Sequence, residues 1–283
     1  MGEKYYKGGY LMLTESMISC YLDRLGCSDA REVSKENLFR LQTAHLEKFP
    51  YTNLSFFRSG TLNFLEPEAL FERIVLNRKG GYCFELNGLF GELLRSLGYD
   101  VTEYFARWHF GGTDAIPMRR HRVIKVVLED EIFLADAGIG SLCPATPLKF
   151  QYNIVQPKNG RAYRIVKDAV LGNVVQAETP EGWLPYFSFT EDPHFPHDFI
   201  YVHAYCVQQP DSVFRNKLFV HRINTETQWH ILVPTPEMPD YVLRIKNETE
   251  VLKPLRTKND MLTVLKDVFG LDYSAEDLPE SLS

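Results

Sequence analysis

The chain has 283 residues, of which 45% are hydrophobic and 24% are charged, and its formal net charge is −6. This is ordinary globular composition, with enough apolar residues for a substantial buried core. The net charge is negative, and the charged residues form no long runs of one sign. Both features argue against nucleic acid or an anionic membrane surface as the main partner, so we expect a small or neutral substrate.

The compartment is the next inference from composition. No apolar run of about 18 residues occurs, and the first residues do not lead into an apolar signal segment, so we expect a cytoplasmic protein. The cysteines are irregularly spaced and form no C-x-x-C pair: Cys20, Cys27, Cys83, Cys143 and Cys206. That pattern fits neither a disulfide framework nor a zinc site, which leaves thiol chemistry or simple burial.

Helical periodicity dominates the first third of the chain. Leu38, Leu41 and Leu46 keep helical spacing, and Leu70 and Ile74 repeat it. We therefore predict a helical bundle from about residue 10 to residue 97.

The middle of the chain changes to β-branched and aromatic runs broken by Gly, Pro and Asp, from about residue 101 to residue 205. Val123 to Leu128 and Tyr152 to Val155 are examples, and they predict antiparallel strands in a barrel or open sheet. Beyond it we predict short strands at about 218–221, 229–233 and 241–245 and a helix at about 259–269. The acidic tail from residue 274 is expected to be loosely held.

Cys83 follows two glycines and a tyrosine. After it, apolar residues recur with helical spacing on one face: Leu86, Leu89, Phe90, Leu93, Leu94 and Leu97. Cys83 is thus predicted at a helix N-terminus, where free amides and the macrodipole favour a thiolate. Gly80 and Gly81 would let the backbone turn sharply and bring amides near a reacting carbonyl. These features alone leave a buried, inert cysteine equally open.

A cysteine nucleophile needs a base and an orienting group, and His121 and Asp136 are the candidates. They flank a predicted hairpin of two strands, 123–128 and 132–135. If the turn centres between residues 128 and 129, the two side chains lie opposite each other. If it centres between 129 and 130, they are diagonal neighbours on one face and within reach. A three-residue loop would place them on opposite faces.

Each of these two residues has a simpler interpretation taken alone. His121 could be a solvated strand start beside Arg119, Arg120 and Arg122, and Asp136 could be a turn-forming aspartate. The order Cys, His, Asp favours a catalytic triad.

The other histidines carry weaker signals. His194, His197 and His203 could suggest metal ligands, but the intervening prolines break any regular scaffold, so we predict no metal. His109 is expected to be a packed strand residue and His45 a helix-face residue. The motifs G-x-S-x-G, G-x-G-x-x-G, Walker A and H-E-x-x-H are absent.

Several spaced motifs resemble the arylamine N-acetyltransferase family over nearly the whole chain. Lys79 to Asn87 is similar to R-G-G-[YW]-C-x-E-x-N, His121 to Val123 to H-R-V, and Asp136 to Gly140 to D-[VA]-G-F-G. Upstream, His45 to Leu54 is similar to H-L-x-x-x-P-F-E-N-L. Downstream, residues 144–148 and 198–214 also match family segments.

The resemblance implies an α+β fold with a papain-like cysteine-protease-type core. Residues 1–97 would be a helical domain carrying the nucleophile, 98–209 an antiparallel β-barrel domain carrying the His and Asp, and 210–283 an α/β lid. It implies Cys83, His121 and Asp136 as the triad and acetyl-CoA as co-substrate, without a metal. The implied CoA-site residues are Gly138, Gly140, Ser141, Tyr205, Ser212 and Phe214, and the implied acceptor-site residues are Tyr82 and Ile139.

The implied reaction moves an acetyl group from acetyl-CoA to the nitrogen of an arylamine, arylhydrazine or arylhydroxylamine, as in xenobiotic metabolism. The cycle is ping-pong through an acetyl-cysteine. A cysteine hydrolase or an amide synthase would use the same triad, and a catalytically silent binding paralogue is a further alternative.

This chain departs from the family pattern at four positions. Thr52 and Lys79 stand where the family has a Glu and an Arg that pair. An ion pair that would brace the loop directly before Cys83, the cysteine loop, is therefore lost, and Arg78 is a candidate to replace the missing cation. Ile139 replaces a common aromatic, which would weaken stacking with an aryl acceptor. His203 stands where an Asn is common.

Overall fold

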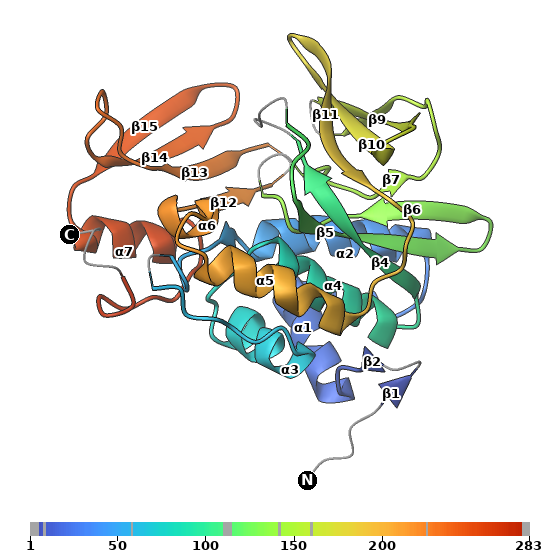
Figure 1. The fold of residues 1–283 in the computed structure, drawn as a ribbon. Helices are drawn as coiled ribbons and strands as arrows, with labels where there is room; N and C mark the ends of the chain where they lie inside the picture. The colour runs from blue at the N-terminus through green and yellow to red at the C-terminus, as the bar shows by residue number, and fades with distance from the viewer. Residues whose placement is uncertain are drawn as a thin grey trace.

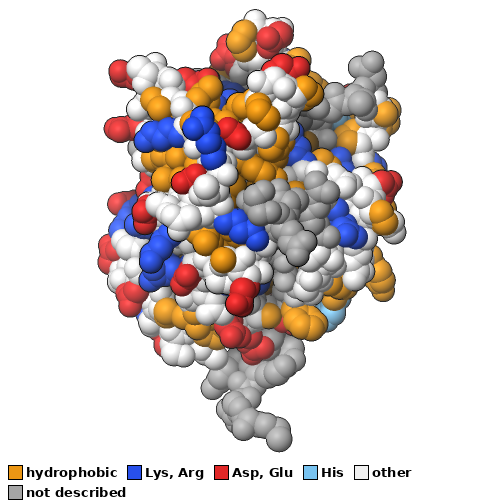
Figure 2. All heavy atoms as spheres, turned by 90° about the vertical axis from the view of Figure 1, so that its left-hand side faces the viewer, with side chains coloured by type: hydrophobic (Ala, Val, Ile, Leu, Met, Phe, Trp, Pro, Cys, Tyr) orange, Lys and Arg blue, Asp and Glu red, His pale blue; other side chains and the backbone are white. Residues whose placement is uncertain are grey.

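The computed structural model describes residues 6–7, 10–57, 59–109, 115–140, 143–158, 161–224 and 226–278. Its described helices include none that is long and apolar enough to cross a membrane. Basic, acidic and apolar side chains are interspersed over the face that carries α7, with no block of one charge (Figure 2). That face agrees with the mixed charge pattern of the sequence.

The first third of the chain is helical, as predicted. It contains α1 (Glu15–Leu25), α2 (Lys35–Lys48), α3 (Pro67–Leu70), the π-helical η1 (Phe71–Leu76) and α4 (Cys83–Ser96), after a short hairpin of β1 (Tyr6–Lys7) and β2 (Tyr10–Leu11). The hydroxyls of Thr14 and Ser34 cap α1 and α2. The single-face pattern after Cys83 predicted α4 correctly, but α4 is buried on every side from Cys83 to Arg95 because sheet and helices surround it (Figure 1).

The middle of the chain forms an antiparallel sheet of eight strands in the order β7-β6-β5-β4-β11-β10-β9-β8. The strands are β4 (Asp100–Trp108), β5 (Arg119–Leu128), β6 (Glu131–Ala135), β7 (Leu148–Lys149), β8 (Gln156–Lys158), β9 (Arg161–Asp168), β10 (Gly172–Thr179) and β11 (Gly182–Phe189). The strand prediction for Tyr152 to Val155 is wrong. Asn153 has a φ of +61°, and Tyr152 makes only an isolated bridge, to Ile165.

Three helical segments connect the two sheets along the chain: η2 (Pro196–Asp198), α5 (Phe199–Gln208) and α6 (Val213–Asn216). In the view of Figure 1, α5 lies below both sheets. The prediction of strands up to residue 205 is wrong for α5. Its β-branched and aromatic residues favour a strand locally, but burial follows helical spacing at Phe199, His203, Cys206 and Val207. Packing therefore overrides local propensity here.

The end of the chain forms a second antiparallel sheet in the order β15-β14-β13-β12-β3. Its strands are β3 (Tyr51–Thr52), β12 (Val220–Ile223), β13 (Gln228–Leu232), β14 (Tyr241–Lys246) and β15 (Glu250–Leu255), followed by α7 (Lys258–Asp267). The sequence did not predict β15, an edge strand with Pro254 and mostly exposed residues. Because β3 comes from the helical third and pairs with β12, this sheet is anchored beside the cysteine loop.

The acidic tail is not loose over its described part. Asp277 pairs with Lys79 at 3.0 Å, Leu278 is buried, and the Tyr273 hydroxyl donates to the Lys79 carbonyl at 2.7 Å. Tyr273 and Asp277 therefore hold the tail against Lys79, in the loop that precedes Cys83. The domain boundaries at residues 97 and 209 stay predictions.

Candidate active site

The β5–β6 hairpin brings His121 and Asp136 together. Its turn consists of Glu129 and Asp130, and Ile124 pairs with Ala135, which is the register that makes His121 and Asp136 diagonal neighbours. The second of the predicted registers is thus confirmed. His121 Nε2 lies 2.7 Å from Asp136 Oδ2, and both side chains are buried.

Asn87 locks the Asp136 carboxylate to the cysteine helix. Asp136 Oδ1 accepts from Asn87 Nδ2 and from the Gly138 N–H, each at 2.9 Å. Asn87 Nδ2 also donates to the Arg122 carbonyl at 2.6 Å, and its Oδ1 accepts from the Ala137 N–H at 2.7 Å. Asn87 lies one helical turn after Cys83, so α4, β5 and the loop after β6 are tied at one side chain.

Two more side chains support the loop that begins at Asp136. Gln42 accepts from the Asp136 N–H at 3.0 Å and donates to the Pro144 carbonyl at 2.9 Å. The Cys143 thiol donates to the Asp136 carbonyl at 2.6 Å. Asn87 and Gln42 were not among the predicted site residues. Asn87 had a signal, because it ends the motif that contains Cys83, whereas nothing local marks Gln42.

Cys83 is the first residue of α4, as predicted, and its thiol lies 3.7 Å from the Arg120 carbonyl. Burial raises the pKa of this thiol well above its ordinary value, the nearby Cys206 and Asp136 raise it further, and the Phe84 N–H acts in the opposite direction. The amide at the helix terminus thus acts in the predicted direction, but desolvation outweighs it. A thiolate here requires a cationic partner.

The loop after Asp136 packs directly on the nucleophile. A Cβ atom at Gly138 would lie 2.9 Å from Cys83 Cα and 2.8 Å from Asn87 Nδ2, so only glycine permits this approach. Since Asp136 occupies His121 Nε2, Nδ1 is the ring nitrogen left for a second partner. The loop after β6 thus places Asp136, with His121 held against it, next to the first turn of α4, which Cys83 begins.

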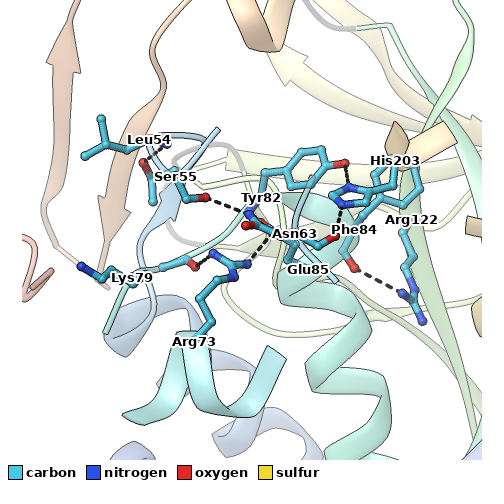
Figure 3. Close-up of polar contacts among 12 residues, drawn as sticks. Leu54, Ser55, Asn63, Arg73, Lys79, Tyr82, Phe84, Glu85, Arg122 and His203 are labelled. Atoms are coloured by element: carbon cyan, nitrogen blue, oxygen red, sulfur yellow. Dashed lines mark hydrogen bonds and ion pairs between the residues drawn. The ribbon is translucent and has the colours of Figure 1, made fainter. Parts of the chain in front are cut away.

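An ion pair braces the cysteine loop, but at other positions than in the family pattern. Arg73 Nη2 lies 2.5 Å from Glu85 Oε1, and Arg73 Nη1 donates to the Gly80 carbonyl at 3.0 Å (Figure 3). Thr52 packs its methyl group where a Gly80 side chain would go. Lys79 instead pairs with Asp277. Arg78 is exposed and is not the substitute.

The described residues among the predicted CoA-site and acceptor-site positions lie at the start of α4, in the loop after β6, on α5 and at the start of α6. A Cβ atom at Gly140 would lie 2.9 Å from His221 Cβ and 3.2 Å from Tyr51 Cβ, and the Phe214 and Tyr82 rings pack with centroids 5.3 Å apart. Ile139 is buried and Tyr205 is half-buried, while the buried Ser212 hydroxyl donates to the Cys206 carbonyl at 2.6 Å. Ser141 lies outside the described residues. The assignments of these residues to CoA or acceptor stay predictions.

The basic cluster around His121 is not a solvated strand edge. Arg122 is 2% exposed, and its guanidinium makes two hydrogen bonds to Glu103, at 2.7 and 2.9 Å. It also lies 4.2 Å from the Phe199 ring centroid. A bulge between β4 and β5 leaves Arg120 without a cross-strand partner residue in β4. Buried Arg122 therefore fixes the strand that carries His121.

No group of three or more His, Cys, Asp and Glu side chains suited to a metal ion occurs within the described ranges. His194 packs edge-on against the Phe105 ring at 4.7 Å, and His203 is engaged by Tyr82. His45 lies on α2, as predicted, and is buried. His109 comes directly after β4 and not within a strand, and it contacts the Ser188 hydroxyl at 2.8 Å.

Comparisons with known proteins agree on one family. A family model described as N-acetyltransferase matches residues 35–278. The arylamine N-acetyltransferase of Mycobacterium tuberculosis is 31% identical over 218 residues, which cover 76% of this chain and 77% of that protein. The arylamine N-acetyltransferase / N-hydroxyarylamine O-acetyltransferase of Salmonella typhimurium is 31% identical over 207 residues, 73% of each chain.

Solved structures show the same fold. The arylamine N-acetyltransferase of S. typhimurium superposes with a TM-score of 0.84 at 25% identity, covering 94% of this chain and 97% of that one. The Mycobacterium marinum enzyme in complex with CoA gives a TM-score of 0.82 at 25% identity, covering 92% and 96%. The predicted α+β fold is confirmed, and this chain belongs to the arylamine N-acetyltransferase family, which is a family of acyltransferases.

Proposed function

We propose that this protein transfers an acetyl group from acetyl-CoA to the nitrogen of an arylamine, arylhydrazine or arylhydroxylamine, through an acetyl-cysteine at Cys83. One observation carries the proposal. The Asp136 carboxylate, held at one oxygen by Asn87 and the Gly138 N–H, presents the other oxygen to His121 beside the first residue of α4. A buried carboxylate held in this way orients an imidazole for proton transfer.

In the first half of the cycle His121 Nδ1 takes the Cys83 proton as the sulfur attacks the thioester carbonyl. The Sγ–C bond forms, the C–S bond to CoA breaks, and His121 returns the proton to the departing CoA sulfur. Because burial raises the pKa of the Cys83 thiol, the sulfur ionises only as His121 becomes cationic, and Asp136 stabilises that cation.

In the second half the acceptor nitrogen attacks the acetyl carbonyl. The N–C bond forms, the Sγ–C bond breaks, and His121 takes the nitrogen's proton and returns it to Cys83. The products are the acetylated acceptor and free CoA. The acetyl-cysteine is therefore the intermediate to look for.

The first experiment mixes purified protein rapidly with acetyl-CoA alone. We expect one equivalent of free CoA per protein and an acetyl mass on the peptide bearing Cys83. Cys83→Ser should lose both, whereas Cys27→Ser, which alters a buried cysteine of the helical domain, should retain them. An arylamine added afterwards should discharge the acetyl group.

Other outcomes would assign a different activity. Continued CoA release without an acceptor would indicate a hydrolase. If acetyl-CoA does not acylate Cys83 but another thioester does, the protein is an amide synthase or uses another acyl donor. If no thioester acylates Cys83, a silent binding protein is favoured.

A further inference from the structure

His203, on α5, has both ring nitrogens engaged although it is 1% exposed. Nδ1 lies 2.6 Å from the Tyr82 hydroxyl, and Nε2 lies 2.8 Å from the Asn63 carbonyl (Figure 3). A carbonyl only accepts hydrogen bonds, so Nε2 carries the proton and Nδ1 accepts from Tyr82. The lowered pKa of His203, caused mainly by burial, agrees with this neutral tautomer.

Tyr82, Asn63, Glu85 and His203 form a closed ring of hydrogen bonds. Asn63 Nδ2 donates to Glu85 Oε1 at 3.0 Å, and the Tyr82 N–H donates to Glu85 Oε2 at 3.0 Å. Tyr82 is thereby held at both ends, with its N–H on Glu85 and its hydroxyl on His203. This ring of hydrogen bonds links α5 to Tyr82, which caps α4, the helix that Cys83 begins.

Tyr82 controls where the nucleophile points because its peptide bond leads directly into Cys83. The Tyr82 ring is fully buried and packs against Phe56 and Phe214 with centroids 5.1 and 5.3 Å away. These contacts are apolar and fix no single hydroxyl position, whereas the bond to His203 does. A misplacement of about 1 Å in a reacting group can cost roughly 100-fold in rate.

We propose that His203 is a positioning residue for the acylation of Cys83, acting through its hydrogen bond from the Tyr82 hydroxyl. The inference rests on the proposed function and extends it from the triad to α5. It assigns a role to a histidine that stands where the family pattern commonly has asparagine.

The two bonds of His203 can be separated by substitution. An asparagine oxygen occupies about the place of Nδ1, so His203→Asn keeps an acceptor for Tyr82 but does not reach Asn63. A glutamine amide reaches the place of Nε2, so His203→Gln keeps the donor to Asn63 but loses the acceptor for Tyr82. His203→Phe keeps a ring and loses both bonds.

The measurement is the acylation rate constant of Cys83 at saturating acetyl-CoA, together with the concentration that gives half the maximal rate. We expect His203→Asn to stay within about threefold of the wild type, and His203→Gln, His203→Phe and Tyr82→Phe to fall roughly 10- to 100-fold with little change in half-saturation. Tyr82→Phe combined with His203→Gln should be no slower than either single variant.

Another buried Tyr–His bond supplies the control for stability. Tyr21 and His45 lie 2.7 Å apart between α1 and α2, and Tyr21→Phe removes a hydroxyl from that pair. This variant should be destabilised to a similar degree in urea yet acylate at the wild-type rate. A loss of rate in Tyr21→Phe equal to that in Tyr82→Phe would reduce the role of His203 to general stability.

Alkylation of Cys83 by iodoacetamide gives a readout that needs no acyl donor. If acetyl-CoA is not the donor, the wild type shows no burst, but the alkylation rates should keep the same order among the variants. Equal rates for His203→Asn and His203→Gln, or a wild-type rate for Tyr82→Phe, in both assays would overturn the proposal.

Discussion

The buried pair of His45 and Tyr21 makes the stability of the protein depend on pH. Both side chains are 0% exposed, and the imidazole packs against the Phe49 and Phe90 rings at 4.9 and 5.0 Å. His45 Nδ1 has no hydrogen-bond partner within the described part of the chain. Burial lowers the pKa of His45 from 6.5 to about 3.

The direction of the pH dependence follows from the fact that the fold disfavours the protonated imidazole. The folded protein binds a proton at His45 only near pH 3, whereas the unfolded chain binds it near pH 6.5, so this contribution is fully present above pH 6.5 and is lost as pH falls toward 3. Between pH 7.5 and pH 5.0 protonation favours the unfolded chain by about 2 kcal/mol for this one histidine.

The double variant His45→Phe with Tyr21→Phe removes the titrating group and its hydroxyl partner together. Urea unfolding at pH 7.5 and pH 5.0 gives the loss of stability on acidification for each protein. We expect the loss to be about 2 kcal/mol smaller in the variant than in the wild type. Any cost of fitting the larger ring is the same at both pH values and cancels, as does the titration of the other histidines.

An equal loss of stability on acidification in both proteins would refute the reasoning. It would mean that His45 is already protonated in the fold at pH 5.0, or that water reaches it. The variant must unfold in a single cooperative transition at both pH values for the comparison to hold.

Two further predictions concern the cysteine loop. Arg73→Gln leaves a buried carboxylate unpaired and should lower the free energy of unfolding by about 3 kcal/mol, whereas Lys79→Gln, at a partly exposed ion pair, should cost under about 1 kcal/mol; urea unfolding at neutral pH measures both. His121→Asn should abolish alkylation of Cys83 by iodoacetamide at pH 7 and restore it only above pH 9, because burial raises the pKa of that thiol; a wild-type pH profile would show that His121 does not ionise it.

Periodicity and register predicted what depends on neighbours in the chain. The spacing after Cys83 located the start of α4, and counting residues through the hairpin gave a small set of registers, of which the one with a turn at Glu129 and Asp130 puts His121 and Asp136 on one face. Both use only the geometry of one helix and one hairpin, although the sequence left the type of the turn open and the structure selected it. Such geometry is insensitive to what packs around it, which is why these parts of the site could be predicted.

What depends on tertiary packing could not be predicted. Residues 199–208 have strand-like composition but form α5, since their buried residues repeat with helical spacing against α4 and β5. Gln42 reaches Asp136 across 94 positions of sequence, and the tail residue Asp277 reaches Lys79 across 198. No local pattern marks contacts of that range.

The Arg73–Glu85 ion pair that braces the cysteine loop could not be predicted from single motif positions. Thr52 and Lys79 taken alone predict the loss of an ion pair, yet Arg73 on η1 forms one with Glu85, which is fully buried. A carboxylate with no exposure requires a nearby cation and hydrogen-bond donors, because its desolvation is otherwise too costly. Glu85 accepts from the Tyr82 N–H and from Asn63, so the brace and the ring through His203 share one carboxylate. Loss of Arg73 should therefore weaken both at once, and the alkylation rate of Cys83 in Arg73→Gln should fall at least as far as in Tyr82→Phe.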